Sequence, residues 1–122
     1  MTDCLYRVVS LEDWEQAQRF GRVPRCGADD RDGFVHLSTV ETFIETANLY
    51  FEIAEAPLAL EIDPKLLGDA LKWEAVASRG GVSFPHLYSE GIPLSAVRAV
   101  ISLDHSLQSG FTSGIKRELS VD

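Results

Sequence analysis

Cysteine is scarce in this chain, and the two cysteines, Cys4 and Cys26, share no CxxC or zinc-ligand spacing. Isolated cysteines of this kind are more often small buried hydrophobic residues than members of a disulfide or a metal site. The chain has three histidines, and no pair of them has the HxH or i, i+4 spacing of a recognisable ligand set. The sequence therefore predicts no metal site, and it also lacks a glycine-rich phosphate loop.

Basic residues are few as well: 11 lysines and arginines stand against 19 acidic residues, a net charge of −8. This balance disfavours attraction to nucleic acid or to anionic membranes, which reward clustered cations. No segment approaches the roughly 20 apolar residues that cross a bilayer, and the first residues lack the basic region and apolar run of a secretory signal. We therefore expect a soluble, cytoplasmic protein without a membrane partner.

The order of the expected elements favours an α+β fold. Strands are expected at 5–9, 34–37, 58–62, 71–76 and 97–103, with an extended segment at 84–88. One helix runs between a capping Ser10 and Gly21, and a second follows the Ser-x-x-Glu capping box of Ser38 and Glu41. Because the helices come early and the strands late, we predict a split, mostly antiparallel sheet with two main helices.

Two segments are expected to lack regular structure. Residues 21–33 read as a loop, in which arginines interleave with Asp29, Asp30 and Asp32, as is typical of a solvated surface. Residues 1–104 are expected to form a single domain, and residues 105–122, which are polar and rich in glycine and serine, a mobile C-terminal tail.

The two histidines of the expected domain stand in similar frames, Phe-Val-His-Leu at 34–37 and Phe-Pro-His-Leu at 84–87. Strand alternation leaves two alternatives for the first. If Val35 and Leu37 face the core, His36 faces a cleft or solvent. If Phe34 faces the core instead, His36 is a buried structural histidine that needs a partner.

Other polar side chains extend this candidate site. Ser38 and Thr39 lie where a strand turns into a helix, a place that suits a phosphate or carboxylate, although helix capping alone also explains Ser38. Glu74 has the chemistry to accept hydrogen bonds from ribose or to act as a general base, and the alternative is an outward-facing strand residue. His86 and Tyr88 share one face of an extended segment and suit one pocket wall.

Three ordered motifs carry a family resemblance: Gly-Phe-Val-His-Leu-Ser-Thr at 33–39, Trp-Glu at 73–74 and Phe-Pro-His-Leu-Tyr at 84–88. Over residues 5–103 the chain closely resembles the bacterial domain-of-unknown-function family 952. That family looks related to the ADP-ribosyltransferase-like superfamily, whose split sheet holds NAD in a central cleft. Members commonly carry a histidine after an aromatic residue in the first strand, and here Arg7 follows Tyr6.

The resemblance implies roles for some of these residues. In such transferases a strand histidine contacts the ribose, aromatic residues stack on the nicotinamide, and a late carboxylate, for which Glu74 is the candidate counterpart, steadies the oxocarbenium ion. Arg7 is implied to replace the missing histidine as an anion ligand.

Two hypotheses follow. The first is a domain that binds a nucleotide-like ligand such as NAD and transfers ADP-ribose, with His36 and Glu74 as catalytic residues and a cleft lined by Arg7, His36, Ser38, Thr39, His86 and Tyr88. The second is a non-catalytic metabolite-binding or protein-interaction module, in which the histidines serve packing and hydrogen bonding. The first predicts that His36 and His86 lie within reach of each other across an open cleft.

Overall fold

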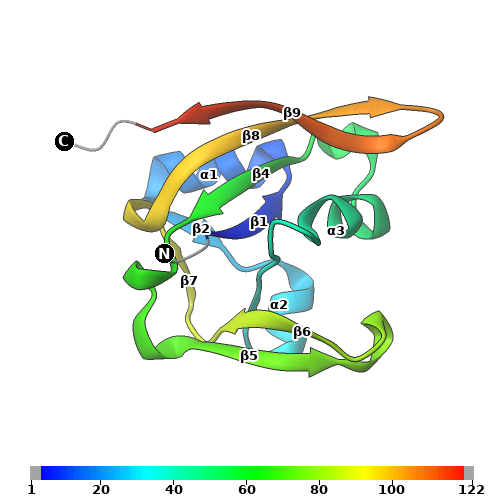
Figure 1. Cartoon of the computed structure of the whole chain (residues 1–122). Coiled ribbons are helices and arrows are strands. Elements are labelled where there is room, and N and C mark those ends of the chain that lie inside the picture. Colours follow the sequence, from blue (N-terminus) through cyan, green and yellow to red (C-terminus); the bar gives the residue numbers. More distant parts are fainter. Residues whose placement is uncertain (1–3, 120–122) are drawn as a thin grey trace.

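A computed structural model describes residues 4–119 and has an α+β architecture (Figure 1). Its helices are α1 (Leu11–Phe20), α2 (Gly27–Asp32) and α3 (Phe43–Tyr50). Its strands are β1 (Leu5–Val9), β2 (Arg22–Pro24), β3 (Val35–His36), β4 (Leu58–Ile62), β5 (Leu71–Val76), β6 (Val82–Leu87), β7 (Gly91–Pro93), β8 (Val97–Ser106) and β9 (Gly110–Glu118). Short 3-10 turns lie at Ile53–Glu55, Pro64–Leu66, Gly68–Ala70, Ala77–Arg79 and Leu94–Ala96. None of the described helices is long and apolar enough to cross a membrane.

The largest sheet has the strand order β1-β4-β8-β9, and each neighbouring pair is antiparallel. Helix α1 begins after Ser10, whose hydroxyl caps the backbone N–H of Asp13, and it ends at Gly21 with φ 80°, a conformation that glycine adopts without strain. The two long helices pack in different apolar clusters. Trp14 of α1 shares a cluster with Val9, whereas Phe43 of α3 shares one with Val8. Because Val8 and Val9 are neighbours on β1, the two helices cover opposite faces of the sheet.

A second antiparallel sheet has the order β3-β6-β5, and β2 pairs with β7 in a third. A single bridge joins the first two sheets: Tyr6 and Ser38 each donate a backbone N–H to the other's carbonyl, at 2.8 and 2.7 Å. In Figure 1 the four-stranded sheet lies in the upper part of the view and the β5–β6 hairpin in the lower part, with α2 between them. The mostly antiparallel, split arrangement predicted from the sequence is therefore present.

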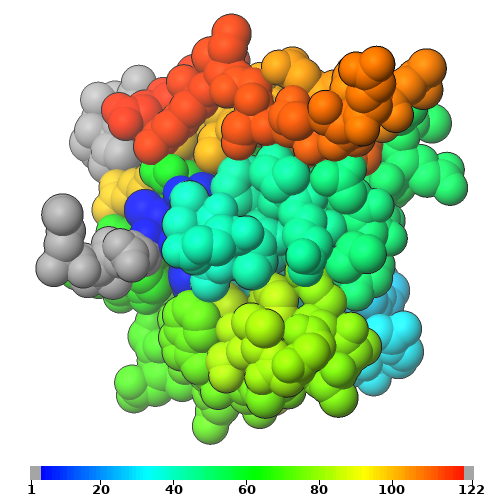
Figure 2. Space-filling model, turned by 45° about the vertical axis from the view of Figure 1, so that its right-hand side comes forward, coloured from blue at the N-terminus to red at the C-terminus, as the bar shows by residue number. Residues whose placement is uncertain are grey.

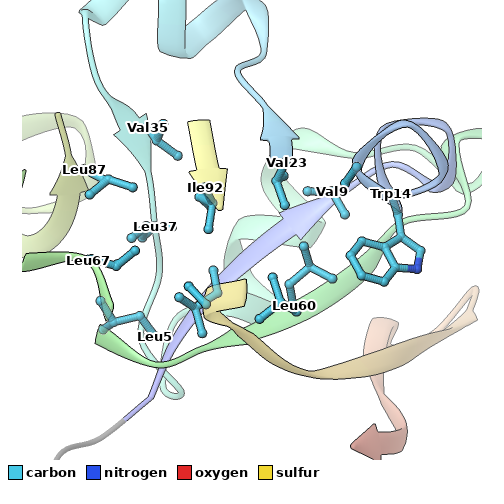
Figure 3. Packing of buried hydrophobic residues seen from close by; sticks show 14 of the residues in the cluster. Leu5, Val9, Trp14, Val23, Val35, Leu37, Leu60, Leu67, Leu87 and Ile92 are labelled. Carbon is cyan, nitrogen blue, oxygen red and sulfur yellow. The ribbon is translucent and has the colours of Figure 1, made fainter. Parts of the chain in front are cut away.

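The main core lies on one face of the four-stranded sheet, against α1 and the two smaller sheets, as Figure 3 shows for its labelled residues. Val35, Leu37 and Leu87 all point into it and are at most 3% exposed. Because side chains alternate along a strand, His36 and His86 then lie on the opposite face of the three-stranded sheet. Of the two alternatives for the first histidine motif, the structure has the one in which Val35 and Leu37 face the core.

The predicted capping box at Ser38 is wrong. Helix α3 begins at Phe43, with Thr42 as its N-cap. The backbone of Ser38 is committed to the bridge with Tyr6, so the chain stays extended at this position and cannot yet turn into a helix. Residues 39–42 form a turn instead, in which the carbonyl of Thr39 accepts the backbone N–H groups of Thr42 and Phe43.

Residues 21–33 are more ordered than the predicted loop, because they form β2 and α2. The interpretation of the aspartates as a solvated surface is wrong for Asp29, which is completely buried. A buried carboxylate needs hydrogen-bond donors and an opposite charge, and residues distant in the sequence supply them here.

The polar segment after residue 104 also differs from the predicted tail. Strand β8 continues to Ser106, and β9 pairs back along it as far as Glu118. Phe111 anchors this hairpin: its side chain is 5% exposed, and the Asn48 side chain binds its backbone N–H and carbonyl at 2.8 and 3.3 Å. The final residues of the predicted tail, 120–122, lie outside the described part of the chain.

Candidate functional site

The structure contains a cavity of about 530 Å³. Its lining residues come mainly from the helices α2 and α3 and from the strands β1, β3 and β6. Figure 2 shows α3 and the turn before it lying between the β8–β9 hairpin above and the β5–β6 hairpin below. Both histidines of the predicted site line this cavity, together with cationic, hydroxyl and aromatic side chains. A more open hollow of about 350 Å³ beside Phe20 and Arg25 contains neither histidine.

The carboxylate of Asp29 accepts several hydrogen bonds beside the cavity. The Arg7 guanidinium binds its carboxylate with both terminal nitrogens, and the backbone N–H of Cys26 donates to it at 2.9 Å. Arg7 is itself only 6% exposed, and its Nη1 also donates to the carbonyl of His36 at 2.8 Å. This buried ion pair ties β1 to α2 and to β3. The free thiol of Cys26 is partly buried beside the cavity, as is that of Cys4 elsewhere in the fold.

His36 lies between two carboxylates. Its Nδ1 is 2.7 Å from Oδ1 of Asp29, and its Nε2 is 2.8 Å from Oδ2 of Asp32. Its backbone N–H also donates to Asp29, at 3.0 Å. A carboxylate accepts hydrogen bonds, so simultaneous contacts of this kind require both ring nitrogens to donate. Neither nitrogen of His36 is then available to a ligand.

The charges around Asp29 set its protonation state. Burial alone raises the pKa of the Asp29 carboxyl, but the hydrogen bond from His36 and the charge of Arg7 outweigh burial and hold that pKa far below its ordinary value of 3.8. On the exposed side, the hydrogen bond from Arg31 lowers the pKa of Asp32. Both carboxylates flanking His36 are therefore ionised at neutral pH.

His86 is bound differently. It is 5% exposed, and its Nδ1 lies 2.9 Å from Oε1 of Glu74 on the adjacent strand β5. The phenol of Tyr88 donates to the same oxygen at 2.6 Å. Both hydrogen bonds lower the pKa of the Glu74 carboxyl, and the bond from Tyr88 has the larger effect. In return, the hydrogen bond to the carboxylate raises the pKa of the Tyr88 phenol. No hydrogen-bond partner for Nε2 of His86 occurs among residues 4–119.

Phe34 organises the two imidazoles. Its ring stacks on that of His86, with centroids 4.0 Å apart, and lies 4.6 Å from that of His36. The two imidazole centroids are 5.8 Å apart, because His36 and His86 are direct partners in the β3–β6 register. The histidines are thus within reach of each other, but as neighbours on adjacent strands at one cavity wall rather than across the open cleft that the nucleotide hypothesis predicts.

The other predicted residues divide into three groups. Arg7 and Ser38 line the cavity with the histidines, and the hydroxyl of Ser38 bonds that of Thr46 at 3.0 Å. Glu74 and Tyr88 do not line the cavity: Glu74 is hydrogen-bonded to His86, and Tyr88 is hydrogen-bonded to Glu74. Thr39 is also outside the lining, and its hydroxyl bonds Thr42.

Sequence reasoning missed several lining residues, above all Asp32 and Arg79. Arg79 lies over the Phe84 ring at 4.5 Å and binds Glu45. Asp32 is four residues before His36. This spacing predicts a contact only within a continuous helix, and here the helix ends at Gly33, between the two residues. Within residues 4–119 no cluster of histidine, cysteine, aspartate and glutamate has the arrangement of a metal site.

These features define an α+β protein with antiparallel sheets and a histidine-lined cavity between them. The chain belongs to a family of proteins of unknown function, DUF952, whose model matches residues 8–100. The match begins within β1 and ends within β8, so it contains both histidine motifs and Glu74.

Solved structures of one bacterial relative are similar over most of the chain. The crystal structure of protein CC0527 from Caulobacter crescentus is 34% identical, with a TM-score of 0.78, and the alignment covers 89% of this chain and 93% of that one. The solution NMR structure of CC0527 is 37% identical over 88% of this chain and 90% of that one, with a TM-score of 0.71. No curated protein matches the chain.

Proposed function

We propose that the cavity binds a small nucleotide-like anion, with NAD as the first candidate. The observation that carries the proposal is the composition of the cavity lining, which contains arginines, hydroxyls, aromatic rings and imidazoles. A volume of about 530 Å³ falls within the range of small-molecule sites, roughly 300–1000 Å³. The resemblance to the ADP-ribosyltransferase-like superfamily points to the same class of ligand.

Arginine supplies the anion-binding part. Arg31 is exposed at the cavity and is bound only to its neighbour Asp32, so its guanidinium can turn toward a ligand. Arg79 is held in place by Glu45 and by the Phe84 ring. A guanidinium is the side chain that matches the oxygens of a phosphate or carboxylate. Arg7, in contrast, is already neutralised by Asp29 and contributes to the wall.

Aromatic and hydroxyl groups supply the rest. Tyr50, Phe51 and Phe84 line the cavity and offer flat apolar surface for a heterocyclic base, while Ser38 and Ser78 offer hydroxyls. Such a combination of a few polar groups on an apolar wall is typical of ligand pockets.

Transfer of ADP-ribose needs in addition a carboxylate beside the sugar. Glu74, the predicted catalytic carboxylate, stands behind His86 and outside the cavity lining. The carboxylates that do line the cavity are Asp13, Asp32 and Glu55, and burial raises the pKa of Asp13. We therefore propose nucleotide binding as the function of the cavity, and transfer of ADP-ribose is tested separately.

The test is a titration of the 15N-labelled protein with NAD, AMP and ribose 5-phosphate, followed by amide shifts in NMR spectra. We expect millimolar or tighter binding, with shifts confined to the cavity wall. Arg31→Gln is expected to weaken binding by about tenfold, the effect of one charge-assisted hydrogen bond. Arg117→Gln is the matched control, because Arg117 is an exposed arginine on β9 that does not line the cavity.

Three results are decisive. Spectra that stay flat with all three compounds at millimolar concentration would refute the nucleotide proposal and favour an interaction module. Equal weakening by both arginine variants would show a general charge effect rather than a site. Release of nicotinamide from NAD would add transfer or hydrolysis to binding.

A further inference from the structure

His86 combines burial with an unused ring nitrogen. It stands in the middle of the three-stranded sheet, between His36 on β3 and Lys72 on β5 in the strand register. The Phe34 ring covers one face of the imidazole, which restricts its rotation. Its Nδ1 is occupied by Glu74, while Nε2 has no partner within residues 4–119.

The Glu74 carboxylate decides which nitrogen of His86 carries the proton. Its Oε1 accepts from Tyr88 at 2.6 Å and contacts Nδ1 of His86 at 2.9 Å. Because the phenol donates to this oxygen, and because the carboxylate is ionised at neutral pH, the oxygen can only accept from the imidazole. In the neutral ring the hydrogen is therefore on Nδ1, and the lone pair is on Nε2.

We propose that His86 is the proton acceptor of the cavity, that its Nε2 takes the proton of a ligand hydroxyl group or a bound water, and that Glu74 and Tyr88 are its positioning residues. The proton passes from the hydroxyl oxygen to Nε2, the oxygen keeps the bonding electron pair, and the imidazolium that forms is balanced by the Glu74 carboxylate. The hydroxyl-bearing class of ligand rests on the proposed function, whereas the state of the imidazole does not.

His36 provides an internal contrast in the same cavity. Carboxylates occupy both of its ring nitrogens, so it has no lone pair to offer. The titratable groups around His86 are Glu74, Tyr88, His36 and Lys72, and Glu74 is the one in direct hydrogen-bond contact. A pH-dependent reaction at this wall is therefore assigned to His86 and not to His36.

The first experiment reads the tautomer of each histidine in the full chain without any ligand. Long-range 1H–15N spectra at mildly alkaline pH distinguish a protonated ring nitrogen from an unprotonated one. We expect His86 with hydrogen on Nδ1 and a bare Nε2. In Glu74→Gln the amide can donate as well as accept, so the mixture of tautomers is expected to change, while the signals of the exposed His105 stay as they are. A wild-type His86 with hydrogen on Nε2 overturns the proposal.

The second experiment measures reactivity. Diethyl pyrocarbonate acylates a nitrogen lone pair, and mass spectrometry resolves the three histidine peptides. We expect His36 to react about tenfold more slowly than His86, although its side chain is 36% exposed and that of His86 only 6%, because a ring nitrogen that donates a hydrogen bond offers no lone pair. His86 reacting no faster than His36 contradicts the proposal, because a nitrogen that the reagent cannot reach cannot take the proton of a ligand either. The two proposals fail separately: absent ligand shifts refute nucleotide binding, and a wrong tautomer refutes the role of His86.

Discussion

Two carboxylate–histidine pairs beside the cavity differ in where the carboxylate lies. Asp29 is fully buried, accepts from Arg7 as well as from His36, and belongs to a network that joins β1, α2 and β3. The Glu74 side chain is 41% exposed, and within residues 4–119 it is hydrogen-bonded only to His86 and Tyr88. A buried charge must be satisfied completely or the fold suffers, whereas an exposed one has water as an alternative partner. The first pair is therefore expected to hold the fold, and the second to orient an imidazole.

The largest effect is expected when each carboxylate is changed to its amide. Asp29→Asn leaves Arg7 as a buried charge without its counter-ion, and the free energy of unfolding should fall by about 3–5 kcal/mol, as when one partner of a buried ion pair is removed. Glu74→Gln is the matched control and should leave the unfolding midpoint nearly unchanged. Urea unfolding followed by the fluorescence of the buried Trp14 measures both. Equal losses in the two variants would end the distinction between the pairs.

The pH dependence of stability should follow Asp29. Its pKa is lower in the folded protein than the ordinary value of 3.8, so the unfolded chain binds the proton more readily. The stabilisation by Asp29 is therefore complete at neutral pH and is lost as the pH falls through about 4 and below. Unfolding free energies measured from neutral pH to about pH 3 should decline less steeply in Asp29→Asn than in the wild type. Parallel curves would contradict this assignment.

The residues in these two predictions also show which features of the site could be predicted from the sequence and which could not. Alternation predicted that Val35 and Leu37 share one face and His36 lies on the other, because period two survives in a short strand, but it left open which face is the core. The contacts of Asp29 were not predictable, since Arg7 and His36 reach it from positions 22 and 7 residues away. Among the aspartates of a polar segment, local sequence does not distinguish the buried one from the solvated ones.

The errors in secondary structure have a similar cause. Ser38 followed by Glu41 satisfies a local capping rule, but the bridge to Tyr6 takes its backbone groups and delays α3 to Phe43. The segment predicted to be a tail forms β9 instead, because β8 is long enough to pair with it and Asn48 binds the backbone of Phe111. In both places a partner distant in sequence overrides a local preference.

A smaller effect is expected from the coupling within each pair. A double-mutant cycle of Asp29→Asn with His36→Gln should give a coupling energy of about 1–2 kcal/mol, because the residues share one buried network. The corresponding cycle of Glu74→Gln with His86→Gln should give no measurable coupling in unfolding experiments, since solvent competes for the Glu74 carboxylate. Where Asp29→Asn folds too poorly for analysis, Asp32→Asn with His36→Gln tests the exposed contact of the same histidine. Strong coupling in the Glu74 pair would reverse the comparison.

The smallest effect concerns the phenol behind His86. The Glu74 carboxylate raises the pKa of Tyr88 above its ordinary value of 10.0, because ionising the phenol would lose a hydrogen bond and place two negative charges together. In an ultraviolet pH titration of the wild type, Tyr88 should therefore ionise late, and Glu74→Gln should bring it back toward the ordinary range. Tyr88→Phe identifies that tyrosine by removing its signal, and it should raise the pKa of Glu74 while leaving the unfolding midpoint unchanged. A wild-type Tyr88 that titrates normally would mean that the phenol does not hold the carboxylate, and Glu74 would then orient His86 alone.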